Sequence, residues 1–101
     1  MIAVQPTTNA NTPSIISSAG TAIASNANRI AWSIQNLGTN PLFVRLGAGG
    51  SPTLFHTVLK GSTGQDDGTG GIASESVGTV YTGIITVDGT NPRFTVLEIA
   101  P

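Results

Sequence analysis

The chain has 101 residues, no cysteine, four basic and five acidic side chains, and a formal net charge of −1. This length is typical of one domain, and without cysteine the chain has neither disulfides nor thiolate metal sites. Free soluble domains carry about 25% charged residues, whereas this chain carries 9%. Such a surface suits a subunit covered by copies of itself or by a larger assembly, and the missing basic patch argues against nucleic acid as a partner.

Residues 1–28 contain no charged side chain and are expected to form an extended N-terminal arm with short β segments at 14–17 and 21–25. Prolines at 6 and 13 disfavour helix there. The apolar residues are too interrupted for a secretory signal or a membrane span, so no targeting or membrane segment is expected. We expect a neighbouring chain to hold this arm through four apolar side chains: Ile2, Val4, Ile15 and Ile16.

Residues 29–101 are expected to form one β domain. In the stretch from Arg29, Ile30, Trp32 and Ile34 alternate with small or polar residues, which is the pattern of a half-buried strand. Residues 42–46 (LFVRL) predict a second strand, and the intervening NLGTNP has turn chemistry. The two strands and their short connection predict a β-hairpin.

The rest of the chain repeats this pattern. Further strands are predicted at 53–60, 72–77, 79–87 and 93–99, with an 11-residue loop holding five glycines at 61–71. Short strands separated by such turns predict an all-β fold, a compact antiparallel β-sandwich or β-barrel of jelly-roll or Greek-key type. The strand order stays open. Several strands are apolar on both faces, so one face is expected to line the core and the other to be covered by a second sheet, a neighbouring subunit or the chain's own arm.

No constellation of residues predicts an enzyme, a cofactor or a metal site. The single histidine, His56, lacks the cysteine and histidine partners that zinc usually has. Asp66 and Asp67 lie in the glycine-rich loop without the ligand pattern of a calcium site or a phosphate-binding loop. A solvated turn, or a contact with a basic residue of a neighbour, is the better interpretation.

Other polar and aromatic residues suggest contacts with partners. In a chain so poor in charge, each cation is a candidate for a specific pair between subunits, and the four are Arg29, Arg45, Lys60 and Arg93. We include Arg45 in the expected interface, with Phe43 from the same strand. Trp32 and Tyr81 are candidates for stacking on a sugar, but their strand faces favour core packing.

The stretch from Trp32 onward resembles small virion structural proteins of tailed bacteriophages. The resemblance lies in IQNLGTNPLFVRLG (34–47), DDGTGG (66–71) and VYTGIITVDG (80–89). It implies a non-enzymatic capsid cement (decoration) protein on the virion surface, made in the host bacterial cytoplasm. Its expected partners are itself, as a homotrimer, and the major capsid protein. A head–tail adaptor, tail or fibre component is the first alternative, and a carbohydrate-binding module is the second.

Overall fold

The computed structural model describes residues 8–101, and within that range it contains strands and no helix. The all-β content that the hydrophobic alternation predicts is therefore confirmed. The nine strands are β1 (Asn9–Ala10), β2 (Ile15–Ile16), β3 (Gly20–Ile23), β4 (Ala31–Asn36), β5 (Leu42–Leu46), β6 (Thr57–Leu59), β7 (Ile72–Glu75), β8 (Ile85–Asp88) and β9 (Phe94–Ala100).

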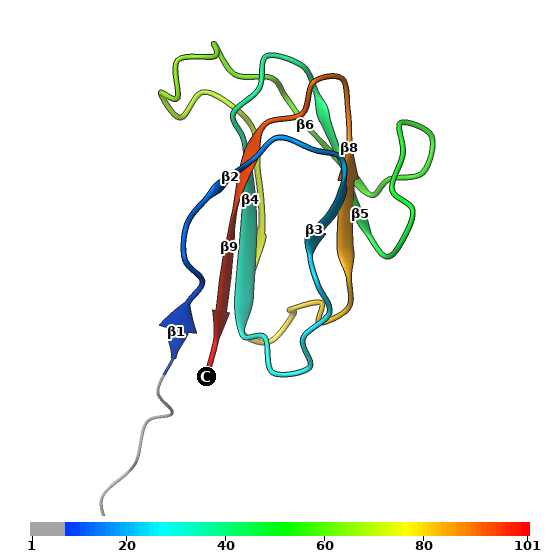
Figure 1. The fold of residues 1–101 in the computed structure, drawn as a ribbon. Helices are drawn as coiled ribbons and strands as arrows, with labels where there is room; N and C mark the ends of the chain where they lie inside the picture. The colour runs from blue at the N-terminus through cyan, green and yellow to red at the C-terminus, as the bar shows by residue number, and fades with distance from the viewer. Residues whose placement is uncertain (1–7) are drawn as a thin grey trace, which may run out of the picture.

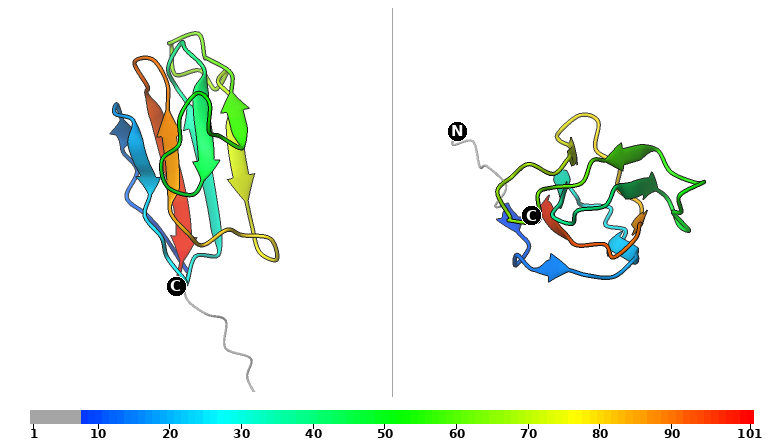
Figure 2. Two further views of the ribbon diagram at one scale, coloured as in Figure 1. Left: turned by 90° about the vertical axis from the view of Figure 1, so that its right-hand side faces the viewer. Right: turned by 90° about the horizontal axis from the view of Figure 1, so that it is seen from above.

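The strands form two antiparallel sheets that pack as a sandwich (Figures 1 and 2). Sheet A has the order β1-β9-β4-β7, with β2 also paired to β9, and sheet B has the order β3-β8-β5-β6. The pairs β2–β9, β3–β8, β4–β7 and β5–β6 are nested, as if one long hairpin were rolled up. Eight strands in two such sheets make a jelly roll. The expected all-β sandwich is confirmed, and the strand order that the sequence left open is that of a jelly roll.

The core lies between the two sheets. Alternate residues of β4 and β5 point inward, and Ile34, Leu42 and Val44 are each at most 1% exposed. Phe94 at the start of β9 is fully buried beside Asn36, whose backbone it faces in the ladder. Burial of each large apolar side chain stabilises the fold by about 1.5–3 kcal/mol.

The predicted hairpin of residues 29–46 is wrong. β4 and β5 have the expected bounds to within two residues, but β4 belongs to sheet A and β5 to sheet B. Their apolar faces meet across the core instead of lying side by side. Strand periodicity shows which side chains point inward, but it does not show which strand is the neighbour.

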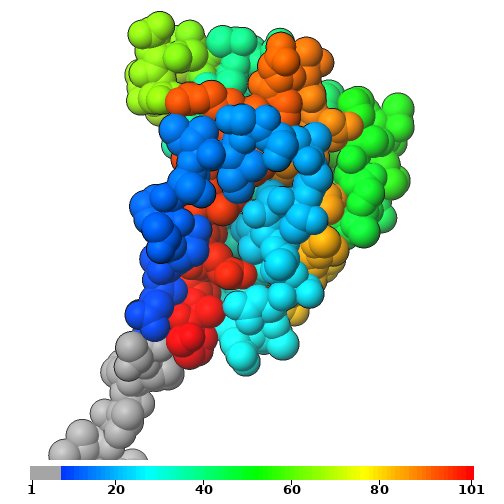
Figure 3. Space-filling model, in the orientation of Figure 1, coloured from blue at the N-terminus to red at the C-terminus, as the bar shows by residue number. Residues whose placement is uncertain are grey.

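The expected division at residue 28 also differs from the structure. β1 and β2 pair with β9, and the chain then crosses to sheet B, where β3 pairs with β8. Figure 3 shows this segment running along the C-terminal strand and across to the second sheet. Ala22 and Ile23 are in the core, so residues 9–23 are part of the sandwich. The expected short β segments are present, while Ile2 and Val4 lie outside the described residues.

Two of the later predicted strands are shorter than expected. The predicted strand 79–87 is replaced by β8, which begins only at Ile85, and the predicted strand 53–60 by β6, which begins at Thr57. The residues before β6 form a loop that folds back over sheet B (Figure 2). The glycine-rich loop at 61–71 is confirmed as irregular structure.

Candidate functional site: the outer faces of the sandwich

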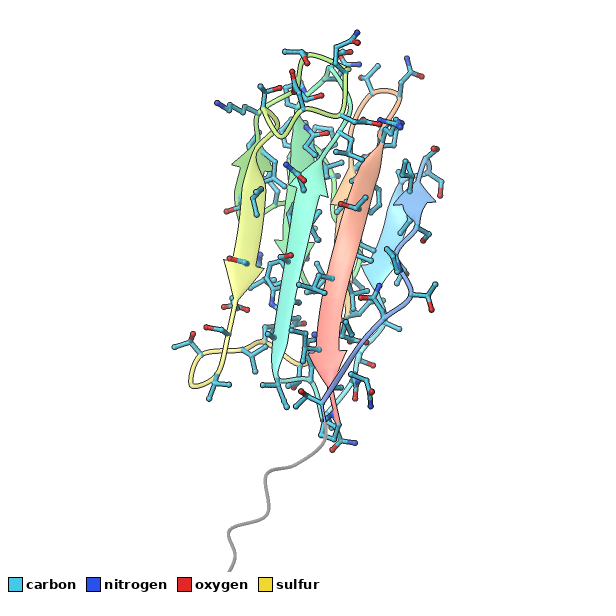
Figure 4. The ribbon with its side chains drawn as sticks, turned by 90° about the vertical axis from the view of Figure 1, so that its left-hand side faces the viewer. Carbon is cyan, nitrogen blue, oxygen red and sulfur yellow. The ribbon has the colours of Figure 1, made fainter. Side chains whose placement is uncertain are left out.

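Figure 4 views the side of the molecule where β7, β4 and β9 lie side by side, and the outer face of these strands carries no formal charge. The register of β4 with β9 and with β7 places eight side chains on it, which we call the sheet A face: Ala31, Ser33, Gln35, Ile72, Ser74, Thr95, Leu97 and Ile99. Ile72 is 60% exposed and Leu97 38% exposed. Protein interfaces are depleted in charge at their centres, so this face has the composition of a docking surface.

A shallow pocket of about 410 Å³ runs along one side of this face. Ala10, Asn11 and Pro13 form one wall, and Ile72 and Leu97 are among the other lining residues. The Asn11 side chain fixes the wall, because its Oδ1 accepts from Glu98 N at 2.8 Å and its Nδ2 donates to Val96 O at 3.2 Å. The N-terminal segment therefore shapes the sheet A face instead of covering it.

Several of the few charged side chains form ion pairs or hydrogen bonds within their own chain. Arg29 is 3% exposed and pairs with Glu98 at 2.9 Å. Glu75 Oε1 accepts from Trp32 Nε1 at 2.8 Å and from Tyr81 N at 3.0 Å. The expectation that Arg29 makes a pair between subunits is wrong, because its guanidinium group is buried within its own chain.

The outer face of sheet B is different, because the chain covers part of it. The loop after β5 folds over Thr86, whose hydroxyl donates to Gly47 O at 2.6 Å and accepts from Gly50 N at 2.8 Å. Phe43 is half-buried, and its ring lies 5.0 Å from that of Phe55. Arg45 is also half-buried, and its Nε has no hydrogen-bond partner among the described residues.

Asp66 and Asp67 lie together in an exposed loop at one end of the sandwich. Asp66 forms a two-pronged ion pair with Arg93, and this pairing holds the pKa of its carboxyl below the usual value. Hydrogen bonds from the hydroxyls of Thr69 and Thr63 lower the pKa of Asp67. Both carboxylates thus have partners in their own chain, and so has Arg93, which we had expected to pair with another subunit.

The expected interface residues are not gathered on one surface. Ile15 is 50% exposed on the outer side of sheet A, where it pairs with Thr95 of the sheet A face, whereas Ile16 packs against the core. Phe43 and Arg45 lie on sheet B, and the two aspartates lie at one end. Ile72 and Leu97 were not among the expected interface residues, although the alternation of their strands indicates them: each is next to a residue that packs against the core, Ala73 and Val96.

The residues weighed for chemistry have structural roles. His56 is exposed, and its Nδ1 accepts from Leu46 N at 3.0 Å. Across residues 8–101 the structure groups no three histidine or acidic side chains in a way that would hold a metal ion. The same range has no helix long and apolar enough to cross a membrane. Trp32 is 4% exposed, so its ring is not a surface platform.

Comparison of the chain with protein-family models, curated proteins and solved structures finds no match.

Proposed function

We propose that this protein is a non-catalytic structural subunit of a tailed-phage virion, a capsid decoration protein that docks through its sheet A face. The observation that supports it is the composition of that face, where eight neighbouring positions carry no charge and two large apolar side chains are exposed. Large uncovered apolar patches are rare on free monomers and mark interaction sites. The resemblance of residues 34–47, 66–71 and 80–89 to small virion proteins is the reason for proposing a phage head as the partner of this face.

The energetics of such docking suit a repeated subunit. Completing the burial of Ile72, which is 60% exposed, contributes about 1–2 kcal/mol, and Leu97 contributes less. A single contact of this kind is weak, but an oligomer that engages several sites on a shell at once gains by avidity. The partners in this proposal are further copies of the chain, as a homotrimer, and the major capsid protein.

The test compares the same substitution on the two outer faces. Leu97→Glu puts a charge on the sheet A face, and Val58→Glu puts one on sheet B at a residue that is 46% exposed. We expect Leu97→Glu to abolish co-sedimentation with phage heads assembled without this chain, and Val58→Glu to retain it. If only Val58→Glu abolished co-sedimentation, the docking surface would lie on sheet B and the proposal would be contradicted.

Copy number separates this proposal from the head–tail adaptor, tail or fibre alternative. A decoration protein occupies sites over the whole head, whereas an adaptor occupies one ring. Quantitative mass spectrometry of purified virions distinguishes the two.

A further inference from the structure

The two long sides of the sandwich differ in how they are closed. On one side the chain itself crosses from β2 to β3 and covers the gap between the sheets. On the other side the edge strands β6 and β7 leave a pocket of about 440 Å³ between them. Its apolar lining includes Trp32, Val44 and Leu46, and its polar lining consists of His56, Thr57, Ser74 and Glu75. This side of the sandwich therefore has a pocket of mixed lining between two strand edges, with apolar side chains at its base.

β7 itself is an exposed strand edge. It pairs with β4 on one side and, among the described residues, with no strand on the other. Native proteins usually protect such edges with lysine, proline, a bulge or a covering segment. β7 reads IASE, and its one charge, Glu75, is occupied by Trp32 Nε1 and Tyr81 N. The edge thus has backbone groups without a strand partner among the described residues, beside a pocket with an apolar base, and strand addition uses both features.

We propose that residues 2–5 of a second copy add as a strand to the free edge of β7 and place Ile2 and Val4 in the pocket between β6 and β7. The sequence MIAVQPT has no charged side chain, and its Ile and Val alternate with the period of a strand. Pro6 has no N–H to donate, so the added strand ends before it. Residues 2–5 then match the four residues of β7 in length. The inference deepens the proposed role as an assembling subunit and rests on it.

A second copy, not the same chain, supplies this strand. β1 and β7 lie at opposite edges of sheet A with β9 and β4 between them, so a strand added beyond β7 lies four strand spacings, about 19 Å, from β1. Val4 is five residues from Asn9, a reach of at most about 17 Å. Even at full extension the same chain falls short of this position, so it cannot place Val4 in a strand along β7.

Cysteine cross-linking tests the geometry without interference, because the chain has no cysteine of its own. Ala3 is expected on the outward side of the added strand, opposite either Ile72 or Ser74, the outward-facing residues of β7. Directly opposed residues have Cα atoms about 4.5–5.5 Å apart, within the range of a disulfide. Purified Ala3→Cys is mixed with Ser74→Cys or with Ile72→Cys and oxidised. The control partner is Thr21→Cys, which is exposed on β3 at the other end of sheet B.

We expect a covalent dimer of the two different variants with one of the β7 positions and none with the Thr21→Cys control. No dimer with either β7 position would overturn the proposal. So would a cross-link that forms only inside the double variants Ala3→Cys/Ser74→Cys and Ala3→Cys/Ile72→Cys and leaves them monomeric, because it would assign the strand to its own chain.

A second measurement uses the uncrosslinked full chain. Ile2→Asp/Val4→Asp is expected to weaken self-association in sedimentation experiments by about tenfold or more, since two apolar side chains lose their burial. The control, Thr12→Asp/Ser14→Asp, adds the same charge at exposed positions and should associate as the unmodified chain does. Equal association of both variants would contradict strand exchange. Leu97→Glu should still form the cross-link between position 3 and β7 but should no longer bind phage heads. The strand-addition proposal and the docking proposal can therefore fail independently.

Discussion

Arg29 and Glu98 form a 2.9 Å ion pair at one end of the sandwich, and the Arg29 side chain is completely buried. Its guanidinium group also donates to Tyr81 O at 2.6 Å, to Gly83 O at 3.1 Å and to Ala24 O at 2.6 Å. One side chain therefore joins the last strand to the loop before β8 and to the segment after β3. A planar group with five donors suits this task, and lysine does not.

Arg29→Met is expected to lower the free energy of unfolding by about 3–5 kcal/mol, because it leaves Glu98 and three carbonyl groups without their donor. Chemical denaturation followed by the fluorescence of Trp32 measures the change. Lys60→Met is the control: this side chain is exposed, and its loss should change stability by less than about 0.5 kcal/mol. Equal effects of the two substitutions would contradict a central role for the buried pair.

Gly70 tests the close contact between the glycine-rich loop and β4. A Cβ atom at Gly70 would lie 1.8 Å from Asn36 O, whereas one at Gly38 would meet its neighbours at 3.4–3.5 Å, an ordinary contact. Gly70→Ala is therefore expected to destabilise the fold by at least about 2 kcal/mol. Gly38→Ala should change stability by less than about 1 kcal/mol in either direction. A similar small effect at both positions, measured by thermal unfolding, would show that the loop can move away.

The sequence predicts single strands well and their partners poorly. The pattern at 42–46 predicts β5 with its observed bounds, because inward apolar residues and the flanking turns are local signals. The β4–β5 hairpin fails because the short loop at 37–41 crosses between sheets. The side chain of Asn36 fixes that crossing with hydrogen bonds to Asn40, Leu59 and Lys60, the last two in a segment distant in sequence.

The predicted strand 79–87 fails at its first half for a comparable reason. Arg29 takes the carbonyl groups of Tyr81 and Gly83, so they are not available to a ladder. No local pattern distinguishes Arg29 from the exposed cations of the chain, and its burial follows only from the three-dimensional fold. The same holds for the sheet A face, whose residues come from three strands that only the topology brings together.

The glycine-rich loop is expected to lose stability in acid. The pKa of Asp66 is held below its ordinary 3.8, chiefly by its hydrogen bonds with Arg93, and that of Asp67 by the hydroxyls of Thr69 and Thr63. A carboxyl whose pKa is lower in the folded state stabilises the fold. This contribution is fully present at pH values above the ordinary pKa of 3.8, and it is lost as the pH falls through the lowered pKa.

Asp66→Asn is the matched variant, since asparagine tolerates the positive φ of 55° at this position and loses the charge and one of the two acceptor oxygens. The stability difference between the unmodified chain and Asp66→Asn should be small, because the pair is exposed. It should shrink further as the pH falls below 3.8. Denaturation curves at several pH values measure it, and a difference that grows in acid would contradict the assignment of the ion pair.

Asn36→Asp is expected to give the opposite dependence on pH. Asn36 is 1% exposed, and its Nδ2 donates to three carbonyl groups, including Leu59 O at 3.2 Å. One oxygen of a carboxylate there still accepts from Gly38 N, but the other faces three acceptors, so this repulsion and burial raise its pKa above the unfolded value of about 3.9. The energetic cost of the charge is absent at pH values below the unfolded pKa and grows as the pH rises through the raised pKa.

Asn36→Ala is the control, because it removes the same donors without adding a charge, and it should destabilise the fold by about 1–3 kcal/mol. The stability difference between the two variants should widen from pH 4 to pH 7 by about 1.4 kcal/mol for each unit that the pKa is raised; a constant difference would mean that water reaches this site.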